Sequence, residues 1–598
     1  MKKEKNTETI SGAGKIFGIW LTLLCFFLPV KFASLAVMPE ATSFFPEDLF
    51  SWLIVTYPAH VWGIVSGATL LAALFFFPLR KGELKTLSGK LLLLWGIVPA
   101  AAVLIGWRNG AYLSYSIGML AHFAGISAFV AAAGLYLLKY PAQRRWLLGG
   151  IVCSALYLGF SGLYQYFVGF AEMREFIDSQ IAAGEQVNYV LWAKVQDNRV
   201  YANFTSANVL AGFLLLTLPL LLTALYQCGD YFEPQKVSRI LFPVIGFGLS
   251  GTVFLMTKSR GGFLCALVIF GIWVLTLPMR RRWRLSLAAA AVATVLAGGI
   301  YIQMYGRGFL SASERVDYIR TSVRMVCEKP LAGYGWGGFF ERHMALKTTN
   351  SNESARDPHN VLASFASQAG IFGGILIAAV LFVPLFYQGR RVLRREASLT
   401  QRAVFWGSCA FLLHCMLDVN MQIPACFAVF GVMQLLALAE EKPQSEPGKT
   451  ACLPLLLLGA AALVSVSFNI HWVVGEKALD DLMIAARPGG NMGSPAEIQQ
   501  KFKRVLKFRS YSTMPYEVMG DHALAMKDFD TAAHYYRKSL AINEARPAIH
   551  RRLHELALQK GDTATAEKEL KRMRELFPSN PEYNDLNKRP VIPVKTVK

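Results

Sequence analysis

The sequence predicts an all-α protein, in which a polytopic membrane helical bundle is followed by a soluble α-helical repeat domain. First, the 598-residue chain is 54% hydrophobic and only 17% charged, with a mean hydropathy of +0.36. Second, apolar runs of about 20 residues, the length that an α-helix needs to cross a bilayer, recur from Ile16 to Val474. Third, the composition beyond Glu476 is that of a soluble protein. We therefore expect a membrane domain at residues 1–475 and a soluble domain at residues 476–598.

The apolar runs predict about thirteen spans. They lie at residues 15–37, 60–78, 90–107, 115–138, 146–168, 207–226, 239–257, 261–279, 285–303, 367–388, 403–419, 422–439 and 452–474. The first run is long and no strong small-residue cleavage site follows it, so we interpret it as an anchor rather than a signal peptide.

Charges between the spans predict the orientation. The N-terminal MKKEK and alternate loops, such as 280–284 (RRRWR) and 390–395 (RRVLRR), are basic, whereas the loop 39–52 is acidic and lacks Lys and Arg. Because Lys and Arg favour the cytoplasmic side, we expect a cytoplasmic N-terminus. An odd number of spans then places the C-terminal domain outside. These clusters hold much of the net charge of +21, so nucleic acid is not an expected partner.

Two segments predicted to lie outside are long, at residues 169–206 and 304–366. Long segments without a span of their own are commonly functional. The second contains eight Lys and Arg residues against six acidic residues. Positive charge on the outer face runs against the usual bias, and an anionic ligand would explain it.

The C-terminal domain contains two similar stretches, KDFDTAAHYYRKSLAINEARP and KGDTATAEKELKRMRELFPSNP, about 33 residues apart. Their small residues, aromatics and terminal prolines resemble tetratricopeptide repeats. A degenerate repeat is expected near residues 480–513. Such helix pairs stack into a concave surface, which indicates either docking of a protein partner or a folded cap on the membrane domain.

Arg260 lies in TKSRGGF, between two apolar runs with almost no loop. An arginine so close to hydrocarbon is costly unless it faces a cavity or a partner. The alternative is an arginine that reaches the interface from a tight turn.

Arg315, Arg320 and Arg324 lie in a stretch with helical periodicity. Ser311 or Ser313 could cap this helix, and apolar residues at 316, 319, 323 and 326 form a stripe at helical spacing. Guanidinium groups suit bidentate contacts with phosphate. The alternative is a solvated basic face.

The stretch PLAGYGWGGF combines four glycines with aromatic residues. No GK[ST] follows it and no βαβ unit surrounds it, so it is not a nucleotide-binding loop. We expect a tight irregular turn, in which Trp336 and Tyr334 are candidate contacts for sugar rings.

His359 lies in Asp357-Pro358-His359-Asn360, where the polar loop ends and an apolar run begins. A neutral imidazole can accept a proton from a hydroxyl, and Asp357 is placed to orient the ring. A structural histidine at a helix end is the alternative. The nine cysteines show neither a disulfide framework nor metal-ligand spacing, so we expect no metal and no cofactor.

Five segments between residues 200 and 440 together resemble the O-antigen ligase superfamily, which includes O-antigen polymerases and protein O-oligosaccharyltransferases. They follow the family order: NFTSANVLAGFLLL (203–216), KSRGGFL (258–264), SASERVDYIRTSVRMVCEKPLAGYGWGGF (311–339), DPHNVLASFASQAGIFGG (357–374) and LLHCMLDVNMQIPA (412–425). The chain departs from the family at TSAN, where relatives often have Asn-Pro-Asn, and at Tyr318-Ile319, where a Trp is common. These departures concern substrate detail rather than class.

The resemblance implies a GT-C-like bundle in the bacterial inner membrane, with its C-terminal domain in the periplasm. It implies metal-independent, inverting transfer of a glycan from undecaprenyl pyrophosphate to a hydroxyl of a lipid, a glycan or a protein. Arg260, Arg315 and His359 are the expected catalytic residues.

Further substrate-binding residues are expected among the polar side chains of the same segments. They are Arg199, Asn208, Arg320, Arg324, Tyr334, Trp336 and Asn360. Two other functions stay open: a flippase for lipid-linked glycans, and a membrane-anchored scaffold that presents the repeats to a protein partner.

Overall fold

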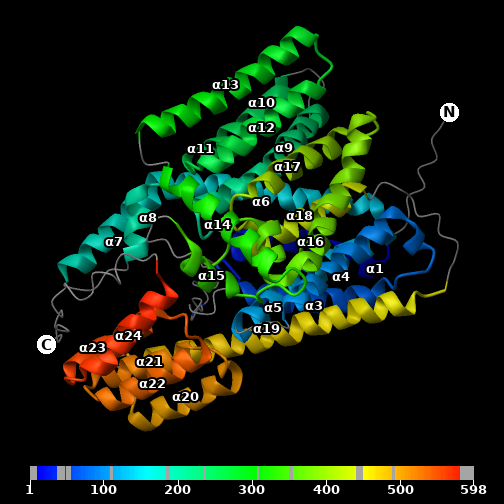
Figure 1. The fold of residues 1–598 in the computed structure, drawn as a ribbon. Helices are drawn as coiled ribbons and strands as arrows, with labels where there is room; N and C mark the ends of the chain where they lie inside the picture. Colours follow the sequence, from blue (N-terminus) through cyan, green and yellow to red (C-terminus); the bar gives the residue numbers. More distant parts are fainter. Residues whose placement is uncertain are drawn as a thin grey trace, which may run out of the picture.

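The computed structural model describes residues 10–36, 48, 56–107, 112–183, 189–232, 237–305, 309–348, 355–438, 449–487 and 492–578. Within these ranges the regular structure is helical, and the β pairing is limited to one bridge between Arg80 and Thr450. The predicted all-α class is therefore confirmed (Figure 1). The acidic loop 39–52 lies outside the described residues, apart from Asp48.

Within the described residues, the first part of the chain forms seventeen α-helices. They are α1 (Gly12–Lys31), α3 (Ala59–Phe76), α4 (Leu87–Trp107), α5 (Leu113–Lys139), α6 (Arg144–Tyr164), α7 (Phe170–Ala182), α8 (Tyr189–Asp197), α9 (Ala207–Phe232), α10 (Val237–Gly246), α11 (Thr252–Met256), α12 (Arg260–Thr276), α13 (Arg281–Tyr305), α14 (Phe309–Glu328), α15 (Gly338–Leu346), α16 (Val361–Leu393), α17 (Leu399–His414) and α18 (Pro424–Leu438). Single π-helical turns join α6 to α7 and α10 to α11.

The remaining helices form the C-terminal part. They are α19 (Cys452–Ala486), α20 (Pro495–Arg509), α21 (Met514–Ala525), α22 (Phe529–Ile542), α23 (Pro547–Gln559) and α24 (Thr563–Leu576).

Helix α5 is the centre of the bundle. It is buried along nearly its whole length and packs against α3, α4, α18 and α19. Its many Ala and Gly residues allow this, because small side chains let helix backbones approach closely. At Gly125, an added Cβ atom would lie only 2.9 Å from the Cα atom of Gly63 in α3.

Each of the thirteen predicted spans corresponds to a helix, but not every helix is long and apolar enough to cross a membrane. In the described ranges, nine helical runs meet that requirement: α1, α3, α4, α5, α6–α7, α9, α10–α11, α16 and α19. Helices α12 and α18 are apolar but shorter. Helix α17 has 16 residues, and α13 begins with a basic RRWR segment. The structure therefore supports a multi-pass membrane protein with nine candidate spans, whereas the total of thirteen stays a prediction.

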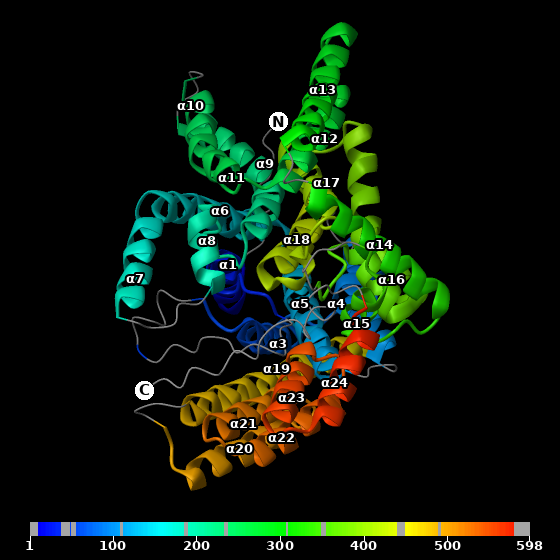
Figure 2. The ribbon, with the colours of Figure 1, turned by 60° about the vertical axis from the view of Figure 1, so that its left-hand side comes forward.

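Helix α19 runs without a break through the domain boundary predicted at residue 475 (Figures 1 and 2). Its 35 residues span about 50 Å at the helical rise of 1.5 Å per residue. In the second half of this helix, the ring centre of Trp472 lies 4.8 Å from the guanidinium of Arg509, the last residue of α20. One rigid helix thus carries the repeat domain.

The repeat domain consists of the helix pairs α21–α22 and α23–α24, preceded by α20 against the end of α19. Helices α22 and α24 begin at Phe529 and Thr563, a spacing of about 34 residues that matches tetratricopeptide repeats. Helix α24 also packs on α15 of the long loop, where Met344 and Phe340 contact Met573 and Phe577. The repeat domain therefore contacts the rest of the chain at two places, the end of α19 and helix α15.

Helix α14 forms as predicted but faces the other way. It begins at Phe309, so neither Ser311 nor Ser313 precedes it as a cap. The apolar side chains of Val316, Ile319 and Val323 are exposed, whereas Asp317, Tyr318 and Thr321 are buried. In a membrane protein the surroundings can themselves be apolar, so an apolar stripe need not face the protein interior.

Candidate functional site

His359 lies in a tight turn that begins α16. Its backbone has φ +54°, a left-handed conformation that is uncommon for residues other than glycine. The turn is held by Asp357 Oδ1, which accepts a hydrogen bond from the His359 N–H at 3.0 Å. Asn360 caps the helix, since its Oδ1 accepts from the Ala363 N–H at 3.0 Å. The imidazole is thus placed by a fixed backbone.

The start of α16 is joined to the end of α17. Asn360 Nδ2 donates to the carbonyl of Met416, and the Val361 N–H donates to the carbonyl of Cys415, both at 3.1 Å. These contacts bring His359 to the turn after α17, where its Nδ1 lies 3.8 Å from Oδ1 of Asp418. This distance is too long for a normal hydrogen bond, and the two groups form an ion pair only when the imidazole is protonated.

Asp418 is held in turn by side chains from the end of the first long segment and from the start of α9. Asn208 Nδ2 donates to Asp418 Oδ2 at 2.9 Å, and Arg199 Nη2 donates to Asn208 Oδ1 at 2.6 Å. Arg199 Nε donates to the carbonyl of Thr257 at 2.9 Å. Asn208 and Arg199, expected to bind substrate, are therefore engaged in a chain of hydrogen bonds that supports Asp418.

The pKa shifts in this cluster reflect burial opposed by charge. Burial lowers the pKa of His359, but the Asp418 and Asp357 carboxylates outweigh it, and the net pKa lies above the ordinary value. Burial raises the pKa of Asp418, but the nearby His359 imidazole outweighs burial, and the net pKa lies below the ordinary range. For Asp357, burial dominates and raises the pKa. The cluster thus favours an Asp418 carboxylate beside an imidazole that binds a proton readily.

Asp357 does not orient the His359 ring, contrary to the sequence-based expectation. Its Oδ2 accepts hydrogen bonds from Ser364 Oγ at 2.6 Å and from Gln422 Nε2 at 2.8 Å, so it fixes the turn instead. The carboxylate that faces the ring is Asp418. Sequence reasoning noted the segment containing Asp418 but assigned that residue no role.

The plane of the imidazole is set by stacking. The ring of Tyr318 lies parallel to it, with centroids 5.5 Å apart and an interplanar angle of 20°. Tyr318 also makes an edge-on contact with His343 of α15, with ring centroids 4.9 Å apart, and His343 stacks on Phe339. Helices α14 and α15 of the long loop therefore support His359.

Arg315 and Arg260 approach the same turn from two further helices. Arg315 Nε donates to the carbonyl of Leu417 at 3.2 Å. Arg260 is exposed at the start of α12, and its neighbour Gly261 lies beside Leu417 and His414, since an added Cβ atom would be 3.7 and 3.8 Å from them. We call residues 414–418 the junction turn. All three expected catalytic residues lie on elements that contact it.

Arg320 and Arg324 are not brought to this cluster. Their side chains are 62% and 60% exposed. Arg320 lies 3.6 Å from Asp317, and Arg324 Nε donates to Glu328 at 3.2 Å. Both are therefore exposed and have local acidic partners, and their expected role in substrate binding stays a prediction.

Residues 329–338, here called the glycine clamp, hold α16 at its kink. The backbone conformation requires glycine, with φ +65°, +81° and +86° at Gly333, Gly335 and Gly337, and with φ +73° at Gly370 of α16. Three backbone hydrogen bonds join the two segments: Tyr334 N–H to Ser367 O at 3.0 Å, Gly335 N–H to Gln368 O at 2.9 Å and Ile371 N–H to Pro330 O at 2.8 Å. The clamp is a structural turn that fixes α16, the helix that begins just after His359.

The two clamp aromatics differ in how far they are exposed. Trp336 is 1% exposed, packs on Phe365 and donates from Nε1 to the carbonyl of Val103 at 2.8 Å. Tyr334 is half-buried, with the Lys329 ammonium 4.4 Å from its ring centre and its hydroxyl bound to Glu328. Trp336 therefore offers no exposed ring face to a sugar.

The nine cysteines are all free. The described residues contain no group of three or more His, Cys, Asp or Glu side chains that could hold a metal ion.

Comparison with protein families identifies two parts of the chain. Residues 245–378 match the family model described as O-antigen ligase, and residues 523–588 match a tetratricopeptide repeat model. No curated protein matches the chain. The resemblance predicted from the sequence is thus confirmed for both parts. The ligase match includes Arg260 and His359, whereas Asp418 lies beyond it.

Proposed function

Because the chain is an O-antigen ligase-like enzyme of the membrane, we propose that it transfers a glycan from undecaprenyl pyrophosphate to an acceptor hydroxyl. The observation that carries this proposal is the convergence of His359, Arg315 and the Arg260 helix start on one polar turn. The transfer takes place at the outer face of the inner membrane, where the orientation predicted from the basic loops puts this turn.

His359 acts on the acceptor. The ring nitrogen that faces Asp418 carries a proton, and the other accepts the proton of the acceptor hydroxyl as its oxygen attacks the anomeric carbon. The Asp418 carboxylate stabilises the imidazolium that forms, since the two groups are 3.8 Å apart. The stacked Tyr318 ring keeps the imidazole in the plane that this transfer needs.

Arg315 and Arg260 act on the donor. As the new bond forms, the bond from the anomeric carbon to the pyrophosphate oxygen breaks, and undecaprenyl pyrophosphate leaves with the electron pair. Fixed cations stabilise this developing charge. Displacement from the opposite side inverts the sugar carbon, and no step requires a metal or a cofactor. The acceptor is a lipid A core sugar, a growing glycan or a protein hydroxyl.

The test is glycan transfer by the purified full chain in detergent, where a transporter has no second compartment and gives no product. We expect His359→Ala and Arg260→Ala to abolish transfer without reducing expression or thermal stability. His534→Ala, a change to an exposed histidine of the repeat domain, is the matched control. Wild-type transfer by His359→Ala would refute the assignment of the site.

The acceptor is identified by a second measurement in the native cell. Deletion of the gene removes glycan from one class of molecule, and mass spectrometry of lipid, polysaccharide and protein fractions shows which. Loss from the protein fraction alone supports the protein-glycosylating branch, whereas loss from lipid A core supports the ligase branch.

A further inference from the structure

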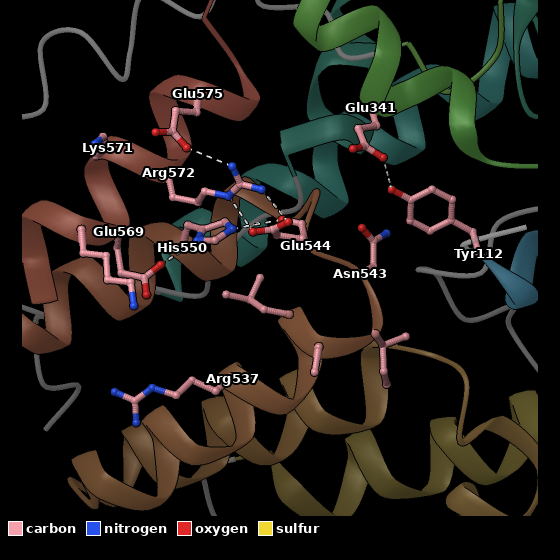
Figure 3. Close-up of a pocket in the computed structure, with 14 residues that line it drawn as sticks. Tyr112, Glu341, Arg537, Asn543, Glu544, His550, Glu569, Lys571, Arg572 and Glu575 are labelled. Carbon is pink, nitrogen blue, oxygen red and sulfur yellow. Dashed lines mark hydrogen bonds and ion pairs between the residues drawn. The ribbon is translucent and has the colours of Figure 1, made fainter. Parts of the chain in front are cut away.

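A cavity of about 830 Å³ lies between helices α22–α24 of the repeat domain and Tyr112 and Glu341 of the membrane domain (Figure 3). Its lining holds equal numbers of carboxylates and cations. They are Glu341, Glu544, Glu569 and Glu575, and Arg537, Lys568, Lys571 and Arg572. Because these charges balance, the cavity favours no single class of occupant. The feature that points to a ligand lies instead at the junction turn.

His414 is the last residue of α17 and the first of the junction turn. Its side chain is 1% exposed, and Asp418 and Arg315 are close enough for their charges to act on it. The proposed transfer gives it no part, because His359 is the base and Asp418 faces that ring. An imidazole buried beside the reacting groups therefore needs its own explanation.

One ring nitrogen of His414 is fixed as a hydrogen-bond acceptor by Asn420. Nδ2 of this amide lies 2.6 Å from Nδ1 of His414 and 3.8 Å from the sulfur of Cys415, and its Oδ1 has no partner among the described residues. Turning the amide around would leave two N–H groups unpaired in place of one oxygen, which costs more. Nδ1 therefore accepts, and the neutral imidazole carries its proton on Nε2.

The protonated nitrogen faces the start of α12. A Cβ atom added at Gly261 would lie 3.8 Å from Nε2 of His414 and 3.7 Å from Leu417. These are ordinary contacts, so there is room for an atom at this point. Among the described residues, none accepts a hydrogen bond from Nε2. Because a buried N–H group without an acceptor is costly, this arrangement points to an acceptor that belongs to a ligand.

The groups around this point suit an anion. The backbone N–H groups of Arg260 and Gly261 begin α12 and have no partner within the helix, and the helix dipole adds positive potential there. The side chain of Arg260 is exposed at the same helix start. Arg315 binds the carbonyl of Leu417 in the junction turn. Two guanidinium groups thus accompany the imidazole N–H.

A phosphate oxygen is the acceptor that fits this set, since it accepts from helix N-terminal N–H groups, from guanidinium groups and from imidazole N–H groups. The carboxylate of Asp418 does not compete, because it accepts from Asn208 and faces His359. We propose that His414 donates a hydrogen bond from Nε2 to a pyrophosphate oxygen of the glycan donor, beside Gly261. This rests on the proposed function, which supplies the lipid-linked pyrophosphate, and it adds a neutral hydrogen-bond donor to the two cations.

The test measures the binding of undecaprenyl pyrophosphate to the full chain in detergent by isothermal titration calorimetry. His414→Gln keeps an N–H donor near the position of Nε2, whereas His414→Met fills the volume without one. Because a hydrogen bond to a charged group is lost, we expect His414→Met to raise the Kd by about tenfold or more. His414→Gln should stay within about threefold of the wild type. A histidine that acts as a cation, or only through packing, would be lost equally in both variants.

Gly261→Ala probes the same point without changing His414. The added methyl group makes only ordinary contacts with Leu417 and His414 and favours the helix, so thermal stability should be unchanged or slightly higher. The methyl group takes the space that the phosphate oxygen needs, so the Kd should rise about tenfold. Gly271→Ala on the same helix is the matched control, since its Cβ atom would meet Ala291 at 3.6 Å, and it should bind like the wild type.

The outcomes separate this inference from the proposed function, because binding is measured without an acceptor. Wild-type affinity in His414→Met or in Gly261→Ala would overturn the role of His414, as would an equal loss in His414→Met and His414→Gln. A chain that binds undecaprenyl pyrophosphate through His414 but transfers no glycan would refute the proposed function alone. A chain that transfers glycan, with the wild-type Kd in both variants, would refute the role of His414 alone.

Discussion

The substitution Gly370→Ala tests how the glycine clamp controls the site. Gly370 has φ +73° and ψ 177° at the kink of α16. An added Cβ atom would lie 2.3 Å from the carbonyl oxygen of Leu331 and 2.9 Å from that of Pro330. Both oxygens belong to the clamp, so the methyl group would push the clamp and the helix apart.

The cost has two parts. A residue with a side chain in this region of φ and ψ is strained by about 1–3 kcal/mol. Ordinary contact needs about 1 Å more than the 2.3 Å available, and this movement would break the hydrogen bond from Ile371 to Pro330, worth about 1 kcal/mol. We therefore expect the free energy of unfolding to fall by about 2–4 kcal/mol. Because a shift of about 1 Å at a reacting group can cost about a hundredfold in rate, transfer should fall even below the melting temperature.

The assay combines thermal melting in detergent with glycan transfer measured well below the melting temperature. Gly459→Ala in α19 is the matched control, since an added Cβ atom there meets nothing within 4 Å, and alanine in a helix interior should be neutral or slightly stabilising. A Gly370→Ala protein with the melting temperature and rate of the wild type would refute the role of the clamp.

Three further outcomes are expected. Asp418→Asn removes the charge that raises the pKa of His359, so the rise of kcat/KM with pH should move to lower pH; an unmoved profile would argue against His359 as the base. Trp336→Phe loses the bond to Val103 and should lower stability by about 1 kcal/mol without changing the acceptor KM, which a sugar-stacking role would raise. Met344→Asp buries a charge between α15 and α24 and should make the repeat domain more sensitive to limited proteolysis, whereas unchanged cleavage would show that this contact does not hold the domain.

Local patterns predicted the helices and the turn well. Apolar length located a helix for each expected span, and the glycines of the clamp indicated the irregular turn that forms at residues 329–338. The repeat spacing likewise appears in α22 and α24. Each of these features depends on residues close together in the chain, which is the information that periodicity and turn chemistry carry.

Contacts between distant segments were not predictable in the same way. Asp357 is adjacent to His359 in the chain, but the carboxylate that faces the ring is Asp418, because α16 begins against the end of α17. An aromatic residue such as Trp336 beside glycines is typical of a sugar contact, but its indole is buried and bound to the carbonyl of Val103 in α4. Neither outcome has a local signal, since both depend on which helices pack together.

The apolar stripe of α14 shows a second limit. Periodicity correctly indicated a helix, but the face with Val316 and Val323 is exposed and the face with Asp317 and Tyr318 is buried. In a soluble protein the hydrophobic effect would have decided the orientation. Near a bilayer that effect no longer separates inside from outside, so the buried polar contacts decide it. The contact of Thr348 with Asp317 at 2.7 Å is one of these.

The backbone of the junction turn links the helices that carry the proposed site. Arg315, Asn360 and Val361 all donate hydrogen bonds to backbone carbonyls of this turn, and Asp418 is its last residue. Positions 415–417 therefore act in the site through their main-chain oxygens, while their side chains pack in or against the hydrophobic core and hold the turn in place. The geometry of the proposed site then depends on one backbone segment to which α14 and α16 are both attached, so any partner that moves either helix would alter the position of cation and base together.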